Sequence, residues 1–309
     1  MSDTFFTAAP NWTWFIIPYF FIGGLAGGAY FLAALLEWFG RPEDRTVVRA
    51  GYGVACFGAI ASGVLLTLDL GRPLRFWHML FKSEEFPSVM FKSWSPISFG
   101  AWAILLFGLF ATLSWLGARA EEGRSPALPA LKSGVLAKLV AGIGGLLGFF
   151  VAGYTGILLS VTNRPIWADS PWLGALFLAS GASTGAATLY LLGRGRGAAE
   201  RTLAWLSSFD TRALVVELVI LIAFIASLGD VARAWLSVWG ALLVLGVVGA
   251  GILLPLGLHL RPARFGSLAA NPAVNSAKLV LLGGFLLRVV TIMASEGIEL
   301  HTAVAGALP

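Results

Sequence analysis

The sequence is poor in charged residues and in cysteine. Only 12% of its 309 residues are Asp, Glu, Lys or Arg, whereas 58% are hydrophobic. Soluble domains carry roughly 25% charged residues, so this protein cannot cover itself with a wetted surface. The composition excludes an ordinary soluble enzyme, a disordered protein and, despite the net charge of +5, a nucleic-acid-binding protein. The single cysteine, Cys56, excludes an intrachain disulfide, a cysteine-ligated zinc site and a protein-bound iron–sulfur cluster.

Histidine is also scarce. A haem held within a bilayer needs paired axial ligands that face each other at one depth. The three histidines are His78 in a loop, His259 at the end of an apolar stretch and His301 in the C-terminal tail. We therefore expect neither haem nor any metal site in this protein. No Gly-rich phosphate loop opens a helix of a βαβ unit, which argues against nucleotide binding.

Long apolar runs account for most of the sequence. A membrane-spanning helix needs about 20 mostly apolar residues. Eight stretches meet this requirement: 14–38, 47–70, 96–117, 133–161, 172–192, 211–229, 232–259 and 277–296. Residues 1–10 lack the basic segment of a cleavable signal peptide, so we read the first stretch as a span. We predict an all-α integral membrane protein of eight helices in two four-helix bundles, residues 1–161 and 162–309.

The loops differ in charge. Those after the first, third, fifth and seventh stretches hold most of the 21 Lys and Arg residues. An excess of Lys and Arg marks the cytoplasmic face. Both termini are therefore predicted to be extracytoplasmic, in the cytoplasmic membrane of a bacterium or archaeon.

Polar and aromatic side chains recur near the predicted outer ends of the first four spans. At 1.5 Å per residue, Tyr19 and Tyr154 each lie roughly 10 Å below the outer surface. Asp69 ends the second span near that level, and Asn11 and Trp14 stand at the mouth of the first. A phenol, an amide, a carboxylate and aromatic faces at one depth suit a flat ring with two carbonyl oxygens. A quinone needs a donor at each carbonyl and a protonatable group in exchange with water.

Simpler interpretations stay open for these residues. Tyr and Trp at interfacial depth commonly form an aromatic belt. Asp69 can instead form an ion pair with Arg72 or Arg75 that fixes the loop. Glu37, at the inner end of the first span, reads as a solvated side chain.

Two charged residues lie deeper. Glu217 falls about two turns into the sixth stretch from its cytoplasmic end, and Arg288 falls near the middle of the eighth. An Arg at that depth should have a partner, and Glu217 is one candidate. The pair is either a structural clamp or one step of a proton route.

Several motifs resemble the NrfD/PsrC family of integral membrane subunits from polysulfide-reductase-type complexes. The most specific is the Asp-Leu-Gly-Arg-Pro turn at residues 69–73. The others are the Gly-rich segment 23–29, Arg75 with Phe76, Ser-Pro-Ile-Ser at 95–98, Tyr-Thr-Gly-Ile-Leu-Leu at 154–159, Pro-Ile-Trp at 165–167, and Arg288. The resemblance covers nearly the whole sequence, including the count of eight helices.

The resemblance implies a haem-free subunit that exchanges electrons between the quinone pool (menaquinone or ubiquinone) and a ferredoxin-like iron–sulfur subunit. That partner would be bound to a molybdopterin catalytic subunit or belong to a larger respiratory complex. The implied pocket lies among the first four helices near the outer face, with Tyr154 on the ring. Asn11 can supply an amide, but no histidine precedes His78. Asp69, Tyr19 or His78 would then replace the histidine ligand that some members carry.

We take Asp69 and Tyr154 as the catalytic candidates. The further ring-binding candidates are Asn11, Trp14, Tyr19, Arg72, Arg75 and His78. The outer loop 71–95 is where we expect the iron–sulfur partner to dock. Two other functions stay open: a secondary transporter or channel, favoured by Glu217, Arg288 and the intrahelical Pro255, and a passive membrane anchor.

Overall fold

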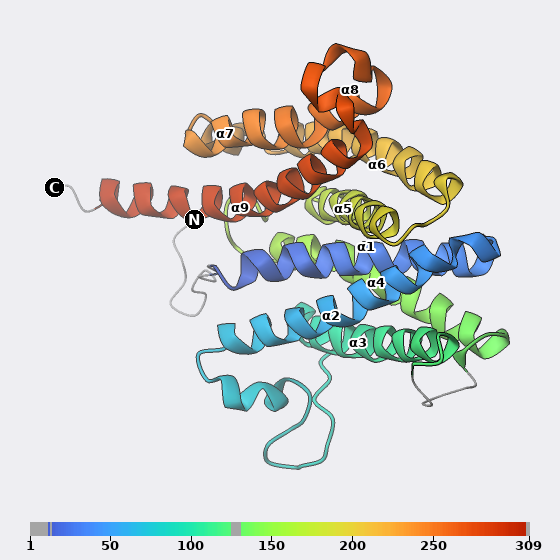
Figure 1. Ribbon diagram of the computed structural model, residues 1–309. Helices are drawn as coiled ribbons and strands as arrows, with labels where there is room; N and C mark the ends of the chain where they lie inside the picture. Colours follow the sequence, from blue (N-terminus) through green and yellow to red (C-terminus); the bar gives the residue numbers. More distant parts are fainter. Residues whose placement is uncertain (1–11, 13, 125–130, 307–309) are drawn as a thin grey trace.

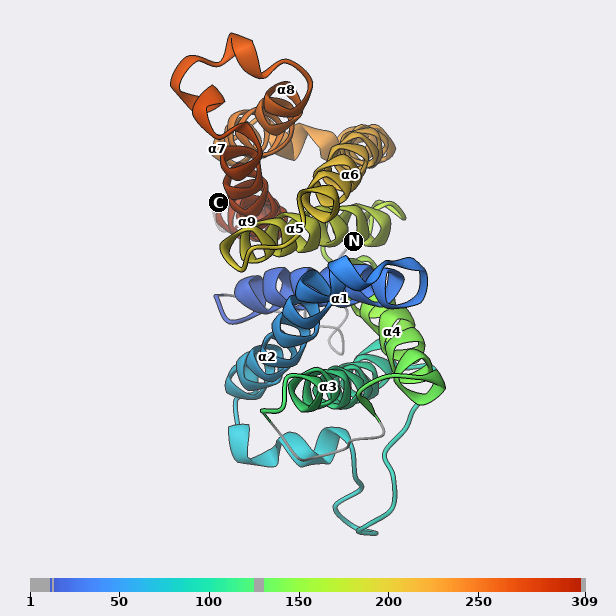
Figure 2. The same ribbon diagram turned by 45° about the vertical axis from the view of Figure 1, so that its right-hand side comes forward.

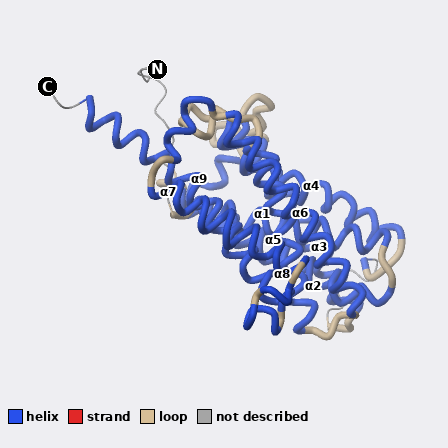
Figure 3. Tube along the Cα trace, turned by 90° about the horizontal axis from the view of Figure 1, so that it is seen from above, coloured by secondary structure: helices blue, strands red, loops and turns tan. Residues whose placement is uncertain are grey.

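The computed structural model describes residue 12 and residues 14–124 and 131–306. Within these ranges the protein is almost entirely helical, and the tube view draws no strand (Figure 3). Seven helices are long and apolar enough to cross a membrane, or eight if the bent pair α6–η4 forms one span. The predicted all-α membrane class is therefore confirmed for the described residues.

The spans run in alternating directions, with the bounds α1 Ile16–Phe39, α2 Arg45–Asp69, α3 Pro96–Glu121, α4 Val135–Ser160, α5 Leu173–Gly195 and α6 Glu200–Ser227. The next span consists of α7 (Val238–Leu242), a π-helical segment η5 (Leu243–Leu253) and α8 (Leu254–Leu260), and α9 covers Pro272–Gly306. We call the end where α1 finishes the inner end and the opposite one the outer end. The first residue of α1 and the last of α9 both lie at the outer end (Figure 1).

Helices α1 and α5 pack against each other at the centre of the molecule (Figure 2). Helices α2, α3 and α4 lie on the α1 side, and α6, α7, α8 and α9 on the α5 side (Figure 2). Because α1 also contacts α9, and α4 contacts α5, the division into bundles 1–161 and 162–309 stays a prediction.

Small residues make the central contact close. A Cβ atom on Gly28 would collide with the Gly181 carbonyl group of α5, and one on Gly27 would collide with Gly148 of α4. Lipid gives no hydrophobic drive for helix association, so close backbone approach and packing must hold the helices together. The Gly-rich segment 23–29 of α1 therefore lies directly against the backbones of α4 and α5.

The sixth span differs from its prediction. It begins at Glu200, 11 residues before residue 211, because the charged residues that seemed to mark a loop lie on the helix itself. Glu217 consequently lies about 25 Å along α6 from its first residue, much deeper than two turns. Beyond Ser227 the backbone turns by 113° into η4 (Gly229–Trp235).

Candidate functional site: the outer ends of α1 to α4

Tyr154 is a fixed point at the outer end. It is buried on α4, and its hydroxyl donates a hydrogen bond to the carbonyl oxygen of Pro96, the first residue of α3. Its ring stacks on Phe150 with centroids 5.4 Å apart. Gly100 allows this position, since a Cβ atom there would collide with the phenol. Tyr154 therefore ties α4 to the start of α3.

Tyr19 and Ser62 lie nearby with hydroxyls that are not engaged. Tyr19 is 3% exposed, it lies close enough to Tyr154 for their phenols to interact, and its hydroxyl makes no hydrogen bond to any described residue. Ser62 on α2 is fully buried, and its Oγ has no partner among the described residues. Both side chains border Gly23, because a Cβ built there would lie 3.6 Å from Ser62 Oγ and 3.7 Å from Tyr19 Cε2. Leaving a buried hydroxyl unpaired costs about 1–3 kcal/mol.

Asp69, the last residue of α2, lies seven residues beyond Ser62, or about 10 Å further out. Its side chain is half-buried, and in the described part of the protein it forms no ion pair with Arg72 or Arg75, which are both exposed. The structure therefore does not contain the loop-fixing ion pair that was the alternative role for Asp69. Asp69 is left as a carboxylate with access to water.

The remaining candidates lie further out. His78 belongs to the 3₁₀ segment η2 (Pro73–Met79). Its ring packs edge-on against that of Trp77, with ring centroids 3.9 Å apart. Trp14 is 65% exposed, and Asn11 lies outside the described residues. The structure therefore brings Tyr19 and Tyr154 together, with Ser62 as an unpredicted third member, and places His78 and Trp14 at the rim.

An aromatic cluster closes the outer end of α1. Trp12 stacks on Trp167 at 5.8 Å, and the fully buried Trp167 donates from Nε1 to the carbonyl oxygen of Thr291 at 2.8 Å. The preceding Ile166 has a φ of 70°, which is strained for a β-branched residue. Its backbone N–H donates to Asp169 at 2.9 Å. The segment after α4 is thus held in a fixed shape over the helix ends.

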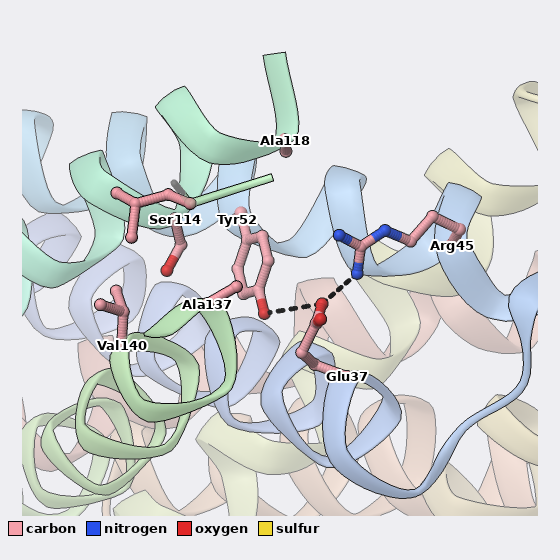
Figure 4. Close-up of a pocket in the computed structure, with 8 residues that line it drawn as sticks. Glu37, Arg45, Tyr52, Ser114, Ala118, Ala137 and Val140 are labelled. Atoms are coloured by element: carbon pink, nitrogen blue, oxygen red, sulfur yellow. Dashed lines mark hydrogen bonds and ion pairs between the residues drawn. The ribbon is translucent and has the colours of Figure 1, made fainter. Parts of the chain in front are cut away.

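A second polar cluster occupies the inner ends of α1 to α4 (Figure 4). Glu37 accepts hydrogen bonds from Arg45 and, at 3.3 Å, from the Tyr52 hydroxyl, and its side chain is only 9% exposed. The expectation that Glu37 is solvated is therefore wrong, because Arg45 reaches back over it from the start of α2. The cavity among these residues has a volume of about 10 Å³, which leaves room for nothing larger than a water molecule.

A larger groove, of about 220 Å³, lies between α1, α4, α5 and α6. Its lining is entirely apolar and includes Phe31, Phe149, Leu178 and Phe209. A groove without a donor cannot hold a quinone ring by its carbonyl oxygens. It suits a hydrocarbon tail.

Arg288 and Glu217 come together as the sequence suggested, but through an intermediary. Arg288 is fully buried, and its guanidinium donates to Ser180 Oγ at 2.5 Å, to the Phe177 carbonyl oxygen at 3.2 Å and to that of Gly284 at 2.9 Å. Glu217 lies near Ser180 and Arg288, and among the described residues it forms neither a hydrogen bond with Ser180 nor an ion pair with Arg288 within 4.0 Å. Ser180 is the link that sequence reasoning missed, because a serine on an apolar helix carries no distinctive signal.

Together these features define a class: a polytopic helical membrane protein with a polar, tyrosine-lined site at one end of its first four helices and buried charges at mid-depth in the rest. In sequence comparisons, the family described as "Polysulphide reductase, NrfD" matches residues 4–298. The chain belongs to this NrfD family, as its motifs suggested, and is an integral membrane protein.

Two named relatives match over most of their length. The protein is 28% identical to a polysulfide reductase chain of Wolinella succinogenes, over 92% of its own length and 94% of the relative. It is 29% identical to protein NrfD of Escherichia coli, over 92% and 95% of the two sequences. A shorter match of 80 residues, 28% identical, links it to a selenate reductase subunit of Mesobacillus selenatarsenatis, over 26% of this protein and 19% of that one.

Proposed function

We propose that this protein is the membrane subunit of a reductase complex and exchanges electrons between quinone and an iron–sulfur partner. The family match supports a subunit role, since two relatives are named as parts of a polysulfide reductase and a selenate reductase. The single cysteine leaves no ligands for an iron–sulfur cluster of its own. Electrons must therefore reach or leave the site through another subunit.

The observation that carries the proposal is the pair of unengaged hydroxyls beside Gly23. Tyr19 and Ser62 offer two hydrogen-bond donors in otherwise apolar surroundings near the outer end. A quinone ring has two carbonyl oxygens that require such donors. The two donors match the two acceptors of the ring, and binding would relieve the cost of the unpaired Ser62 hydroxyl.

A bound quinone supplies the capacity to take up or release two electrons and two protons. In our proposal Tyr19 and Ser62 orient the ring by hydrogen bonds, and Tyr154, fixed to Pro96, sets the spacing between α3 and α4. Asp69 exchanges protons between the site and water, because its carboxylate is half-buried at the end of α2. Asn11, Trp14, Arg72, Arg75 and His78 are proposed as the rim of the entrance.

The iron–sulfur subunit, and through it a molybdopterin subunit or a larger respiratory assembly, is proposed to dock on loop 71–95. This loop lies at the same end as the hydroxyl pair (Figure 1), and its exposed aromatic side chains include Phe76, Phe86 and Trp94. Exposed aromatic groups are typical of interface centres. By the charge of the loops, this end faces away from the cytoplasm.

The test uses the complex purified with its partners. Tyr19→Phe and Asp69→Asn each remove one polar function with little change in shape, and Tyr154→Phe removes the link to Pro96. Tyr190→Phe, near the inner end of α5, is the matched control. We expect quinol-linked electron transfer to fall in the first three variants and to be unchanged in the control.

The alternatives give different results in the same assay. A passive anchor would keep full quinol-linked electron transfer in all four variants of an intact complex. A transporter would purify without an iron–sulfur partner and take up a solute in vesicles. Either result contradicts the proposal.

A further inference from the structure

Buried polar side chains form a continuous series through α5, α6, α8 and α9. At the inner end, His259 on α8 is held between two serines, with Ser207 Oγ 3.0 Å from its Nδ1 and Ser276 Oγ 2.7 Å from its Nε2. The carboxylate of Asp210 lies 3.4 Å from the same Nε2 atom. Asp210 is only 4% exposed, so a titratable pair is enclosed where three helices meet.

From Asp210 the series extends outward along α5. The Ser183 hydroxyl donates to Asp210 at 2.6 Å. Ser180, one turn further out on the same face, accepts a hydrogen bond from Arg288, and Glu217 lies near both of them. Ser180, Ser183 and Arg288 are fully buried, and Glu217 is 4% exposed. Ionisable groups at such depth are expensive in a membrane and mark ion or proton pathways.

The series spans a large part of the membrane. Ser276 and Arg288 are 12 residues apart on α9, or about 18 Å, compared with roughly 30 Å of hydrocarbon. Among the described residues two steps lack a direct hydrogen bond, from Ser183 to Ser180 and from Ser180 to Glu217. The Cβ atoms of Ser183 and Ser180 lie about 5–6 Å apart, and in this account one water molecule bridges each step.

Aromatic side chains close the series beyond Arg288. The guanidinium lies over the Phe177 ring at 4.8 Å, and Phe177 packs against Phe20 at 6.2 Å. Phe20, Phe177 and Trp167 are all fully buried. Within the described part of the protein, the polar path therefore opens at the inner end and is closed at the other.

We infer that His259, Asp210, Ser183, Ser180, Glu217 and Arg288 form a proton relay that opens only at the inner end and ends at Arg288. The relay adds a proton path to the proposed function. Its coupling to quinone chemistry depends on that function. A proton on the His259 imidazolium passes to the Asp210 carboxylate. The Ser183 and Ser180 hydroxyls each accept one proton and release their own, so that Glu217 is protonated. No electron moves, and water at the inner end protonates His259 again. Because the path has no second mouth, the proton on Glu217 returns by the same route when the charge at the ring site is restored, so the relay takes up and releases one proton in each turnover.

A purely structural clamp would be arranged differently. It needs only a direct Glu217–Arg288 ion pair, whereas here Ser180 lies between them and a second acid, Asp210, lies two turns inward with a histidine. The Arg288 Nε–H, moreover, has no partner among the described residues. A fully paired clamp would leave no such donor, because burying it unpaired is costly.

The outer end of the relay lies against α1 opposite the proposed ring site. A Cβ on Gly24 would lie 3.2 Å from Arg288 Nη2, whereas the adjacent Gly23 faces Ser62 and Tyr19. One helix backbone thus separates the Arg288 charge from the two hydroxyls. Charges interact strongly over such a distance in a medium of low dielectric constant.

The first test measures the rate of proton uptake on the side of the inner end during the first turnover of the whole complex in sealed vesicles. A short-chain quinol and an artificial acceptor drive electron transfer, and a pH-sensitive dye reports on the side of the inner end. We expect Asp210→Asn and Ser183→Ala to slow this uptake by about 100-fold, the scale of a lost proton-transfer group, while electron transfer with a protonophore is retained. Asp210→Glu should restore uptake. Thr211→Val is the control, because that hydroxyl bonds only to its own helix at Ser207.

A second readout does not depend on quinone. Infrared difference spectra after an acid jump on the inner side should contain a carboxyl band that Glu217→Gln removes and that Ser183→Ala delays. Absence of quinol-linked electron transfer in the wild type would overturn the proposed function, and the infrared band would still decide the relay. Unchanged proton uptake in Asp210→Asn, or an undelayed band in Ser183→Ala, would overturn the relay.

Discussion

Replacing Ser62 by alanine should have opposite effects on stability and on quinone binding. The Ser62 hydroxyl is buried without a partner among the described residues, and such a group destabilises the folded protein by about 1–3 kcal/mol. Its removal should therefore stabilise the quinone-free protein by roughly 1 kcal/mol, which raises the melting temperature by about 2 °C. If the hydroxyl donates to a quinone carbonyl, the same change should weaken binding by about 0.5–1.5 kcal/mol, or 2- to 12-fold.

Ser295→Ala is the matched control for this experiment. Ser295 on α9 is the other serine in the described residues whose buried Oγ has no partner. Its removal should raise the melting temperature similarly and leave quinone binding unchanged. The measurements are thermal unfolding in detergent without quinone and the KM for a short-chain quinol in the assembled complex. Equal effects of the two substitutions on KM would refute the assignment of Ser62 to the ring site.

Three further predictions concern glycine positions and the buried charged residues. Gly24→Ala should displace Arg288 and slow proton uptake. Gly195→Ala at the end of α5, whose Cβ would have no neighbour within 4 Å, should not, and paired vesicle assays compare the two variants. Arg288→Gln should lower proton uptake more than Arg288→Lys, because only lysine keeps the positive charge that interacts with Glu217. Equal losses of uptake in the two variants would contradict this prediction. Glu37→Gln should weaken the ion pair with Arg45 and lower the melting temperature by a few degrees without changing proton uptake, since this cluster lies outside the relay.

The membrane class and the family could be predicted because they depend on long apolar runs and on local motifs. Tyr19 and Tyr154 could be placed at one depth by counting residues along their helices. Their relation to Ser62 could not, because a lone serine in a Gly- and Ala-rich helix is indistinguishable from a packing residue. The packing of α1 against α2 brings Ser62 next to Gly23 and Tyr19, and this packing is visible only in the structure.

The relay could not be predicted from the sequence, and the reason lies in the charges of α6. Loops are usually charged, so the charges at Arg201, Asp210 and Arg212 resemble those of a loop, and the predicted helix begins too late. In the fold, Asp210 and Glu217 lie two turns apart on one face of a continuous helix. The free-energy cost of burying these two carboxylates is offset by Ser180, Ser183 and His259 on neighbouring helices. The sequence of α6 alone does not reveal these partners.

Covalent labelling with a photoreactive quinone tests the ring site most directly. The complex would be irradiated with the probe and digested, and the labelled peptides identified by mass spectrometry, with excess unlabelled quinol as competitor. The account predicts competed labels on the peptides of α1 and α2 that carry Tyr19 and Ser62. Labels confined to the residues of α4, α5 and α6 that line the apolar groove, or labels that the competitor does not displace, would contradict it.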